Sequence, residues 1–353
     1  MADYLIKQLR MAISAAVEST FNTTPSGAFW KFVTTSKNFY VQSAEKFDDK
    51  GKIGLGNDLP NVQFTGYLNP VTMEIADSLD TFIHPMLIRR AFGQAETVVA
   101  GSGPASGTFV HSFKVAPQIT NPISSTMLWG MGGADKAWNG VTVNSIKVSG
   151  NRSEQPQFSA TLVGTGKGSA VGSPTINAYV VPNYLDGAET TIFYTKDSTL
   201  TNLADRDSST RRVVAWDVSL NNNNKTDDKR PGDPRVNAND PSGGHYINTM
   251  LNGEREVMGG ITITLDGTAQ EVIDSLADEV LTDFTISTKG KFIGSTTIQY
   301  GVDFIFPKCY LNCEEGVDDN GLAVIRATIK PVYESVSDTI LKVAITNSTA
   351  TCV

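Results

Sequence analysis

Residues 138–164 read WNGVTVNSIKVSGNRSEQPQFSATLVG, and this stretch decides the fold class. In its second arm, Phe158, Ala160 and Leu162 alternate with polar residues. A period of two is typical of a strand with one buried face and one hydrated face. The stretch is therefore predicted to be a β-hairpin with a polar turn between its arms. We expect its free edges to pair with a neighbouring domain.

The first arm of this hairpin changes phase part of the way along. Val141 and Val143 share one parity, whereas Ile146 and Val148 share the other. One extra residue in a strand moves every later side chain to the opposite face. The slip at 144–145 therefore predicts a β-bulge or a local change of the buried face. Nothing in the hairpin is chemically reactive, so we expect it to build sheet.

The composition fits a globular chain long enough for two domains. It has 353 residues, of which 40% are hydrophobic and 19% charged, which is typical of a globular rather than a disordered chain. The formal net charge is −8, from 29 basic and 37 acidic residues. A protein that grips nucleic-acid phosphates normally carries a basic excess. The charge therefore argues against tight DNA binding, although it suits DNA that must slide past.

No targeting segment or disulfide framework is expected. The first residues carry Lys7 and Arg10 and lack an uninterrupted apolar core, so no signal peptide is predicted. No apolar run is long enough to predict a membrane span. The cysteines are odd in number and gather near the end of the sequence, at Cys309, Cys313 and Cys352. Such spacing predicts neither a secreted disulfide set nor a zinc site.

Helical spacing predicts three helices. Residues 2–19 carry one apolar face, expected either to pack on the chain itself or to dock on a neighbouring subunit. Residues 71–92 show a second apolar face, which Pro85 must kink or split. A capping box at 268–271 predicts the start of a third helix.

The rest of the chain reads mainly as strand. Residues 44–61 are expected to form an exposed loop or hairpin tip, 165–191 a seam between halves, and 221–244 a long polar surface loop. Alternating or β-branched runs predict strands at 28–43, 64–68, 109–115, 211–220, 261–265, 284–293, 298–306, 322–333 and 339–346.

The two halves of the chain repeat one order of elements. A glycine-led strand at 66–68 precedes one predicted helix, and another at 260–263 precedes the next. We therefore predict domains at 1–180 and 181–353, the second carrying the 221–244 loop. Each half is mostly antiparallel sheet with one helix. The predicted fold class is mainly β, a β-sandwich or open barrel with a flanking helix.

No constellation of residues predicts catalysis. His84, His111 and His245 are isolated, and His111 shares the parity of Phe109 and Phe113, which favours a core or interface histidine. The sequence contains no nucleophile elbow, phosphate loop or dinucleotide fingerprint. We therefore predict no enzyme activity, catalytic residue, cofactor or metal ligand.

Segments spread over most of the chain share their pattern with one known family. They are residues 15–25, 66–68 with 77–79, 109–115, 140–164, 217–222, 255–263 and 343–347. With them the chain resembles the tail tube proteins (major tail proteins) of long-tailed, non-contractile bacteriophages. The resemblance implies a β-sandwich whose sheets pair around a ring to line a tube. Rings stack from head to tail tip, and DNA passes through.

The family resemblance also implies partners and a location. The protein would be a structural component of the virion tail, assembled in the host cytoplasm without a membrane. Its partners would be further copies of itself, the tail terminator and the tail tip proteins. Tape measure protein and phage DNA would pass through the lumen without specific binding. Two tube domains per subunit imply a trimeric ring with pseudo-sixfold symmetry, whereas one domain with large insertions implies a hexamer.

Residues on predicted strands and loops are the expected assembly contacts. Residues 45–52 and 221–244 are candidates for ring-to-ring contacts or outer decoration. The individual candidates are Phe47, Lys52, Ile53, Leu55, Val141, Val143, Phe158, Leu162, Trp216, Ile261 and Ile263.

A second hypothesis comes from another class of protein. A carbohydrate- or receptor-binding β-sandwich, from an adhesin or a tail tip, would need a cluster of exposed aromatic side chains with polar partners. Trp30, Trp129, Trp138 and Trp216 are scattered, and Trp216 has core parity. This pattern favours the tube hypothesis.

Overall fold

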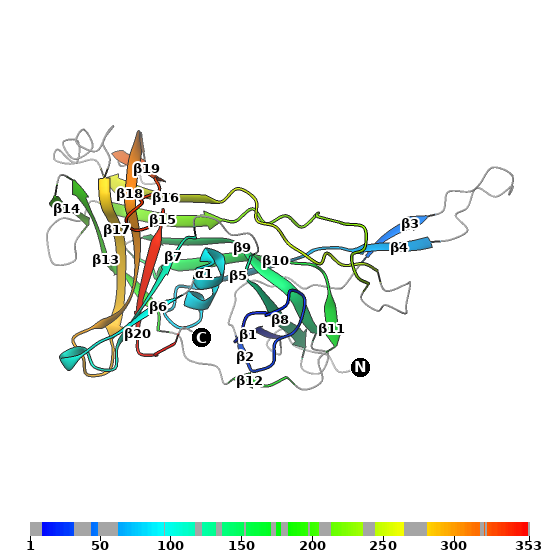
Figure 1. Cartoon of the computed structure of the whole chain (residues 1–353). Coiled ribbons are helices and arrows are strands. Elements are labelled where there is room, and N and C mark those ends of the chain that lie inside the picture. Colours follow the sequence, from blue (N-terminus) through cyan, green and yellow to red (C-terminus); the bar gives the residue numbers. More distant parts are fainter. Residues whose placement is uncertain are drawn as a thin grey trace, which may run out of the picture.

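The computed structural model shows a protein built almost wholly from strands, with one α-helix, α1 (His84–Phe92), among the described residues (Figure 1). The prediction of a mainly β fold with a flanking helix is confirmed. The described residues are 9–31, 44–48, 63–94, 96–116, 122–131, 136–151, 153–170, 174–177, 183–196, 198–204, 213–235, 244–264, 281–317, 321 and 323–351.

The strands are numbered in the order in which they occur along the chain. In order they are β1 (Leu9–Ser14), β2 (Phe29–Lys31), β3 (Ala44–Asp48), β4 (Gln63–Leu68), β5 (Val71–Ser78), β6 (Thr97–Ala100), β7 (Phe109–Lys114), β8 (Ser124–Met131), β9 (Lys136–Asn151), β10 (Gln157–Gly164), β11 (Gly168–Ala170), β12 (Ile176–Asn177), β13 (Leu185–Lys196), β14 (Thr199–Ala204), β15 (Val213–Asn221), β16 (Glu256–Thr264), β17 (Leu281–Phe292), β18 (Gln299–Val317), β19 (Ala323–Pro331) and β20 (Lys342–Asn347). A short 3₁₀ helix, η2 (Gly103–Ala105), lies between β6 and β7.

The long strand β9 organises the first half of the chain. Its beginning pairs with β8 and β11, and its end pairs with β10. Beyond these neighbours, β8 pairs with β1, β1 with β2, and β10 with β5. The strand order is therefore β2-β1-β8-β9-β10-β5.

The long strand β18 plays the same part in the second half. Its beginning pairs with β17 and β20, and its end pairs with β19. Beyond these neighbours, β17 pairs with β13, β13 with β14, and β19 with β16. The order β14-β13-β17-β18-β19-β16 therefore repeats the order of the first half, strand for strand.

Besides isolated bridges such as Asp80 with Tyr184, two pairings between described strands join the halves into one body. β9 pairs with β15 through Val148 and Val218, and β7 pairs with β20 through Phe113 and Val343. One hydrophobic cluster includes side chains from both halves. Within this cluster the Trp216 ring on β15 lies 6.0 Å from the Phe304 ring on β18, so these two strands of one large sheet contact each other through the core. The division into domains at 1–180 and 181–353 stays a prediction.

The hairpin at 138–164 forms as the sequence predicts, as β9 and β10. Thr161 pairs with Ser145, but the next residue, Leu162, pairs with Val143. Asn144 is therefore the extra residue, and the bulge predicted at 144–145 is confirmed. Both outer edges of the hairpin are occupied within the chain, by β5 and by β15 of the second half.

The predicted helix at 2–19 is wrong where the structure describes it. Residues 9–14 form β1, which pairs with β2 and β8 on its two edges. Met11, Ala12 and Ile13 are all buried. A strand buried on both faces reads as a continuous apolar run, which periodicity alone does not separate from a helix.

The predicted helix at 71–92 is a strand followed by a helix. Residues 71–78 form β5, in which buried Val71, Met73 and Ile75 alternate with exposed residues. Pro85 does not divide a longer helix: it lies in the first turn of α1, where a missing N–H costs nothing. The apolar residues that suggested one helix belong to two elements, β5 and α1, and both sets lie in the core.

Other predictions are tested only in part, or differ from the structure in their bounds. The third predicted helix, after 268–271, lies outside the described residues, as do 32–43 of the predicted strand at 28–43. The seam at 165–191 contains β11, β12 and the start of β13. The strand predicted at 298–306 continues through Pro307 to Val317, where its partner changes from β20 to β19.

Candidate functional site

Most of the predicted assembly contacts lie in the chain's own core. Their exposed fractions are 5% or less, so they hold the chain together, and a direct contact with a second copy stays untested. These residues are Val141, Val143, Phe158, Leu162, Trp216, Ile261 and Ile263. Phe47 lies on β3, and its side chain is outside the description. Lys52, Ile53 and Leu55 lie outside the described residues.

The β3–β4 hairpin projects away from the rest of the protein (Figure 1). We call the described parts of this hairpin, residues 44–48 and 63–68, the arm. The sequence predicted a loop or hairpin tip at 44–61; residues 44–48 of that segment form β3, and the others lie outside the described residues.

One edge at the end of β18 is not covered by any strand that the structure describes. Cys309 pairs with β17 on one edge and with β19 on the other, so these neighbours lie on opposite sides. Past Cys309 the β19 pairing continues to Val317, but no described strand pairs with the β17 side. Among the described strands, residues 310–317 therefore have no backbone partner along this one edge.

The strands β10, β9, β15 and β19 share a polar outer face. Lys147 on β9 pairs with Ser159 on β10 and Ser219 on β15, and Arg326 and Thr328 continue the face on β19. A shallow trough crosses this face, lined in part by Lys147, Asp217 and Arg326. The Lys147 ammonium lies 4.0 Å from the Asp217 carboxylate, and both are well exposed. The trough therefore carries charges of both signs.

Behind the sheet, the bulge in β9 anchors the chain that leaves β15. The Asn222 backbone N–H donates to the Asn144 carbonyl at 2.7 Å, and the Asn224 N–H donates to the Asn144 side-chain oxygen at 2.8 Å. The Asn222 amide also donates to the carbonyls of Ala91 (3.1 Å) and Val143 (3.0 Å). Asn222 is buried, unlike most of the described part of the 221–244 loop.

Arg255 completes this junction at the end of α1. Its guanidinium donates to the Asn222 side-chain oxygen (2.7 Å) and to the carbonyls of Ala91 (2.6 Å) and Ala116 (2.8 Å). Burial lowers the pKa of Arg255 to about 10, so it stays charged near neutral pH. A cation suits the carbonyl end of a helix. Sequence reasoning did not find this role, since its partners lie far away along the chain.

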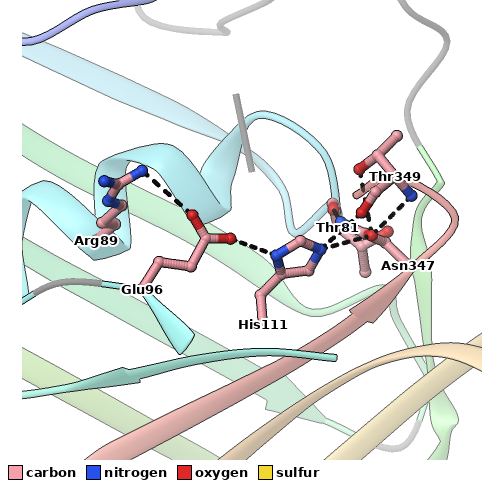
Figure 2. Close-up of polar contacts among 6 residues, drawn as sticks. All are labelled: Thr81, Arg89, Glu96, His111, Asn347 and Thr349. Carbon is pink, nitrogen blue, oxygen red and sulfur yellow. Dashed lines mark hydrogen bonds and ion pairs between the residues drawn. The ribbon is translucent and has the colours of Figure 1, made fainter. Parts of the chain in front are cut away.

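A second buried network surrounds His111 on β7 (Figure 2). The ring Nδ1 lies against the Glu96 carboxylate, whose other oxygen is 3.2 Å from the Arg89 guanidinium of α1. Burial of His111 confirms the prediction of a core histidine.

The other side of the His111 ring holds the end of the chain's last strand. Its Nε2 lies 3.0 Å from the Asn347 side-chain oxygen and 2.9 Å from the Thr349 carbonyl. The Asn347 amide donates to the Thr81 carbonyl at 3.0 Å. Both ring nitrogens are thus engaged by acceptors, and neither is free to take a proton from a substrate. The geometry fits positioning of the strand rather than catalysis.

Glu18 forms the third network, within a segment that carries the family resemblance. Its buried carboxylate accepts hydrogen bonds from the backbone N–H groups of Asn22 (2.9 Å) and Gly140 (3.0 Å). It also accepts from the hydroxyls of Ser124 and Thr126, each at 2.8 Å. The carboxylate thereby connects the chain after β1 to β8 and β9. No group of three or more potential metal ligands occurs among the described residues.

We expect Cys309 to resist alkylation in the folded protein. Burial raises the pKa of Cys309 to about 12, so near pH 8 it carries about a thousandfold less thiolate than an ordinary cysteine. Burial also raises the pKa of the half-buried Cys313, which serves as an internal control and should react faster. Iodoacetamide labelling followed by peptide mass spectrometry measures both rates. Rapid native labelling of Cys309 would contradict the described packing.

In the part of the chain that the structure describes, no helix is long and apolar enough to span a membrane. No protein-family model and no curated protein matches the chain.

Proposed function

We propose that the protein is a structural subunit of a phage tail tube, which assembles with copies of itself into stacked rings around a channel for DNA. The mainly β fold, the repeated strand order and the projecting arm support this proposal. The described histidines and cysteines offer no reactive arrangement that favours an enzyme instead.

The open edge of β18 is the observation that carries the proposal. The pairings of β9 in the first half match those of β18 in the second. β8 and β10 lie on opposite edges of β9, as β17 and β19 lie on opposite edges of β18. Past the end of the β8 pairing, β15 pairs with that same edge of β9. By the repeat, a strand of a second copy would cover the β17 side of β18. The β9–β15 pairing within the chain is thus the template for a pairing between chains.

Head-to-tail pairing of this kind leads to a ring. A contact that joins two different surfaces of identical subunits gives a ring when its rotation closes and a helical filament when it does not, and we propose that here it closes. Closure also removes the open edge, which otherwise invites aggregation. Because each chain supplies two similar halves, we propose a trimer with pseudo-sixfold symmetry, with a hexamer as the alternative. The polar outer face of the sheet suits a hydrated wall, along which DNA and the tape measure protein would move.

Proline substitutions at the β18 edge test this proposal. Of two neighbouring amides in a strand, one faces β19 and the other faces the open edge, so Asn312→Pro and Cys313→Pro should behave differently. The variant facing β19 should be destabilised by about 3 kcal/mol. The other should stay folded but associate about a hundredfold more weakly, as size-exclusion chromatography with light scattering measures.

Alanine substitutions are the matched controls for this pair. Asn312→Ala and Cys313→Ala remove the same side chains but keep the backbone N–H groups, so both should assemble. Assembly of both folded proline variants at wild-type concentrations would exclude the β18 edge as the contact.

A further inference from the structure

The His111 ring lies where the first half of the chain holds the end of β20 (Figure 2). His111 belongs to β7, whose partner β20 ends at Asn347. The side chain is 0% exposed, so bulk water does not reach its ring nitrogens. Each proton on the ring therefore needs an acceptor from the protein, and a nitrogen without a proton needs a donor.

The Nε2 atom of this ring faces two hydrogen-bond acceptors. One is the Thr349 backbone carbonyl at 2.9 Å, which can only accept. The other is the Asn347 side-chain oxygen at 3.0 Å. The Asn347 amide cannot be turned around, because its nitrogen donates to the Thr81 carbonyl (3.0 Å) and its oxygen accepts from the Thr349 N–H (3.0 Å). These contacts therefore need a proton on Nε2.

The Nδ1 atom faces an acceptor as well. It lies against one oxygen of the Glu96 carboxylate, whose other oxygen is 3.2 Å from the Arg89 guanidinium. That ion pair uses the carboxylate in its charged form, which can only accept hydrogen bonds. These contacts therefore need a proton on Nδ1 too. A neutral imidazole has one N–H group and imidazolium has two, so the arrangement requires the charged ring.

Glu96 is the charged group that contacts the ring. α1 contributes Arg89, which reaches the ring through Glu96. The neighbouring strands place Val98 of β6 and Ile345 of β20 opposite His111, and neither side chain is charged. Among the described contacts, one carboxylate thus balances the charge of the imidazolium.

We propose that the charged His111 ring is a latch for residues 348–351, which follow β20, and that loss of one ring proton releases them. The proton on Nδ1 faces a charged carboxylate and is held more strongly than the proton on Nε2, which faces neutral oxygens. Nε2 therefore loses its proton first, and its lone pair then faces the Asn347 and Thr349 oxygens. The latch acts within a single chain, so it does not depend on the proposed assembly.

The direction of the pH effect follows from this geometry. Raising the pH removes the Nε2 proton, so the segment is held at lower pH and released as the pH rises. Acid that protonates Glu96 also weakens the contact with Nδ1. The latch therefore holds over a pH range that protonation of Glu96 limits below and deprotonation of His111 limits above.

Two titrations of the wild-type protein test this proposal. NMR of the His111 ring nitrogens follows both N–H groups, and hydrogen exchange measures protection of the Thr349 amide, corrected for the intrinsic effect of pH on exchange. Protection should fall about tenfold or more over the pH interval in which Nε2 loses its proton, because a hydrogen bond from a charged group is lost. The Phe304 amide, in the middle of β18, should stay protected, which separates local release from unfolding.

Glu96→Gln separates the charge of the ring from its position. A glutamine amide can donate to Nδ1 while the Nε2–H still donates to Asn347 and Thr349, so a neutral ring satisfies every contact. The Thr349 amide of this variant should stay protected through the interval in which wild type loses protection. His245→Gln is the control, because His245 contacts Asp233 outside this network, and its Thr349 amide should respond as in wild type.

Three results would overturn the latch. The first is a His111 ring with a single N–H group while the Thr349 amide is still protected. The second is a Glu96→Gln variant whose Thr349 amide loses protection in the same interval as wild type. The third is loss of protection at Thr349 only together with Phe304, which would show unfolding of the whole chain in place of a local release.

Discussion

Phe158→Asp is expected to unfold the protein or leave it barely folded. Phe158 is 1% exposed on the core face of β10, and its ring stacks on that of His84 at 4.2 Å. Removing a buried phenylalanine costs about 3–5 kcal/mol, and burying an unpaired carboxylate adds to this. We expect a loss of about 5 kcal/mol or more, comparable with the total stability of many domains. Leu162→Asp, at 0% exposure on the same face, should behave alike.

Ser159→Asp is the matched control for this prediction. Ser159 is the next residue on β10 and is exposed on the opposite face. Urea unfolding followed by circular dichroism compares the variants, and Ser159→Asp should stay within about 0.5 kcal/mol of wild type. Equal stability of Phe158→Asp and Ser159→Asp would contradict the assigned register of the hairpin. Phe158→Asp cannot report on assembly, because it destabilises the fold of the single chain.

Arg255→Ala is expected to cost about 3 kcal/mol or more. The change removes the guanidinium donor from the Ala116 carbonyl and the Asn222 side-chain oxygen, and leaves the Ala91 carbonyl with only the Asn222 amide. Buried groups that lose a charged partner lose more than a typical hydrogen bond contributes. The effect should extend to the bulge in β9, because Asn222 also donates to Val143. Chemical denaturation measures the loss.

Arg326→Ala is the control for charge and size. Arg326 is exposed on the outer face of β19, so its loss should change stability by about 0.5 kcal/mol or less. Arg255→Lys separates charge from geometry, since a single ammonium cannot reach three acceptors in a planar fork. We expect it to fall between Arg255→Ala and wild type. A fully stable Arg255→Ala would show that α1 does not need this anchor.

The strands were predictable where one face is buried and the other hydrated. The alternation in β10 and the phase slip at Asn144 both appear in the structure, because the pleat couples side-chain parity to burial. The prediction was wrong for β1, which has neighbours on both edges and buried side chains on both faces. It was also wrong at β5, where a strand runs directly toward a helix and the two apolar patterns merge.

The polar networks were not predictable from the sequence. Asn222, Arg255 and Glu18 look like surface residues, yet Asn222 and Glu18 are buried and Arg255 is half-buried, because their partners come from distant parts of the chain. Only the tertiary fold brings those carbonyls and amides together. The open edge of β18 is a similar case. It is recognised only by comparing β18 with β9, because the corresponding edge of β9 is paired with β15.

The central claim is that the chain closes into rings through strand pairing. Negative-stain electron microscopy of the purified wild-type chain, with its mass in solution measured by light scattering, tests this most directly. We predict closed rings with the mass of a trimer, or of a hexamer in the alternative, and stacking of those rings into tubes at higher concentration. A folded protein that stays monomeric at every concentration would contradict the claim.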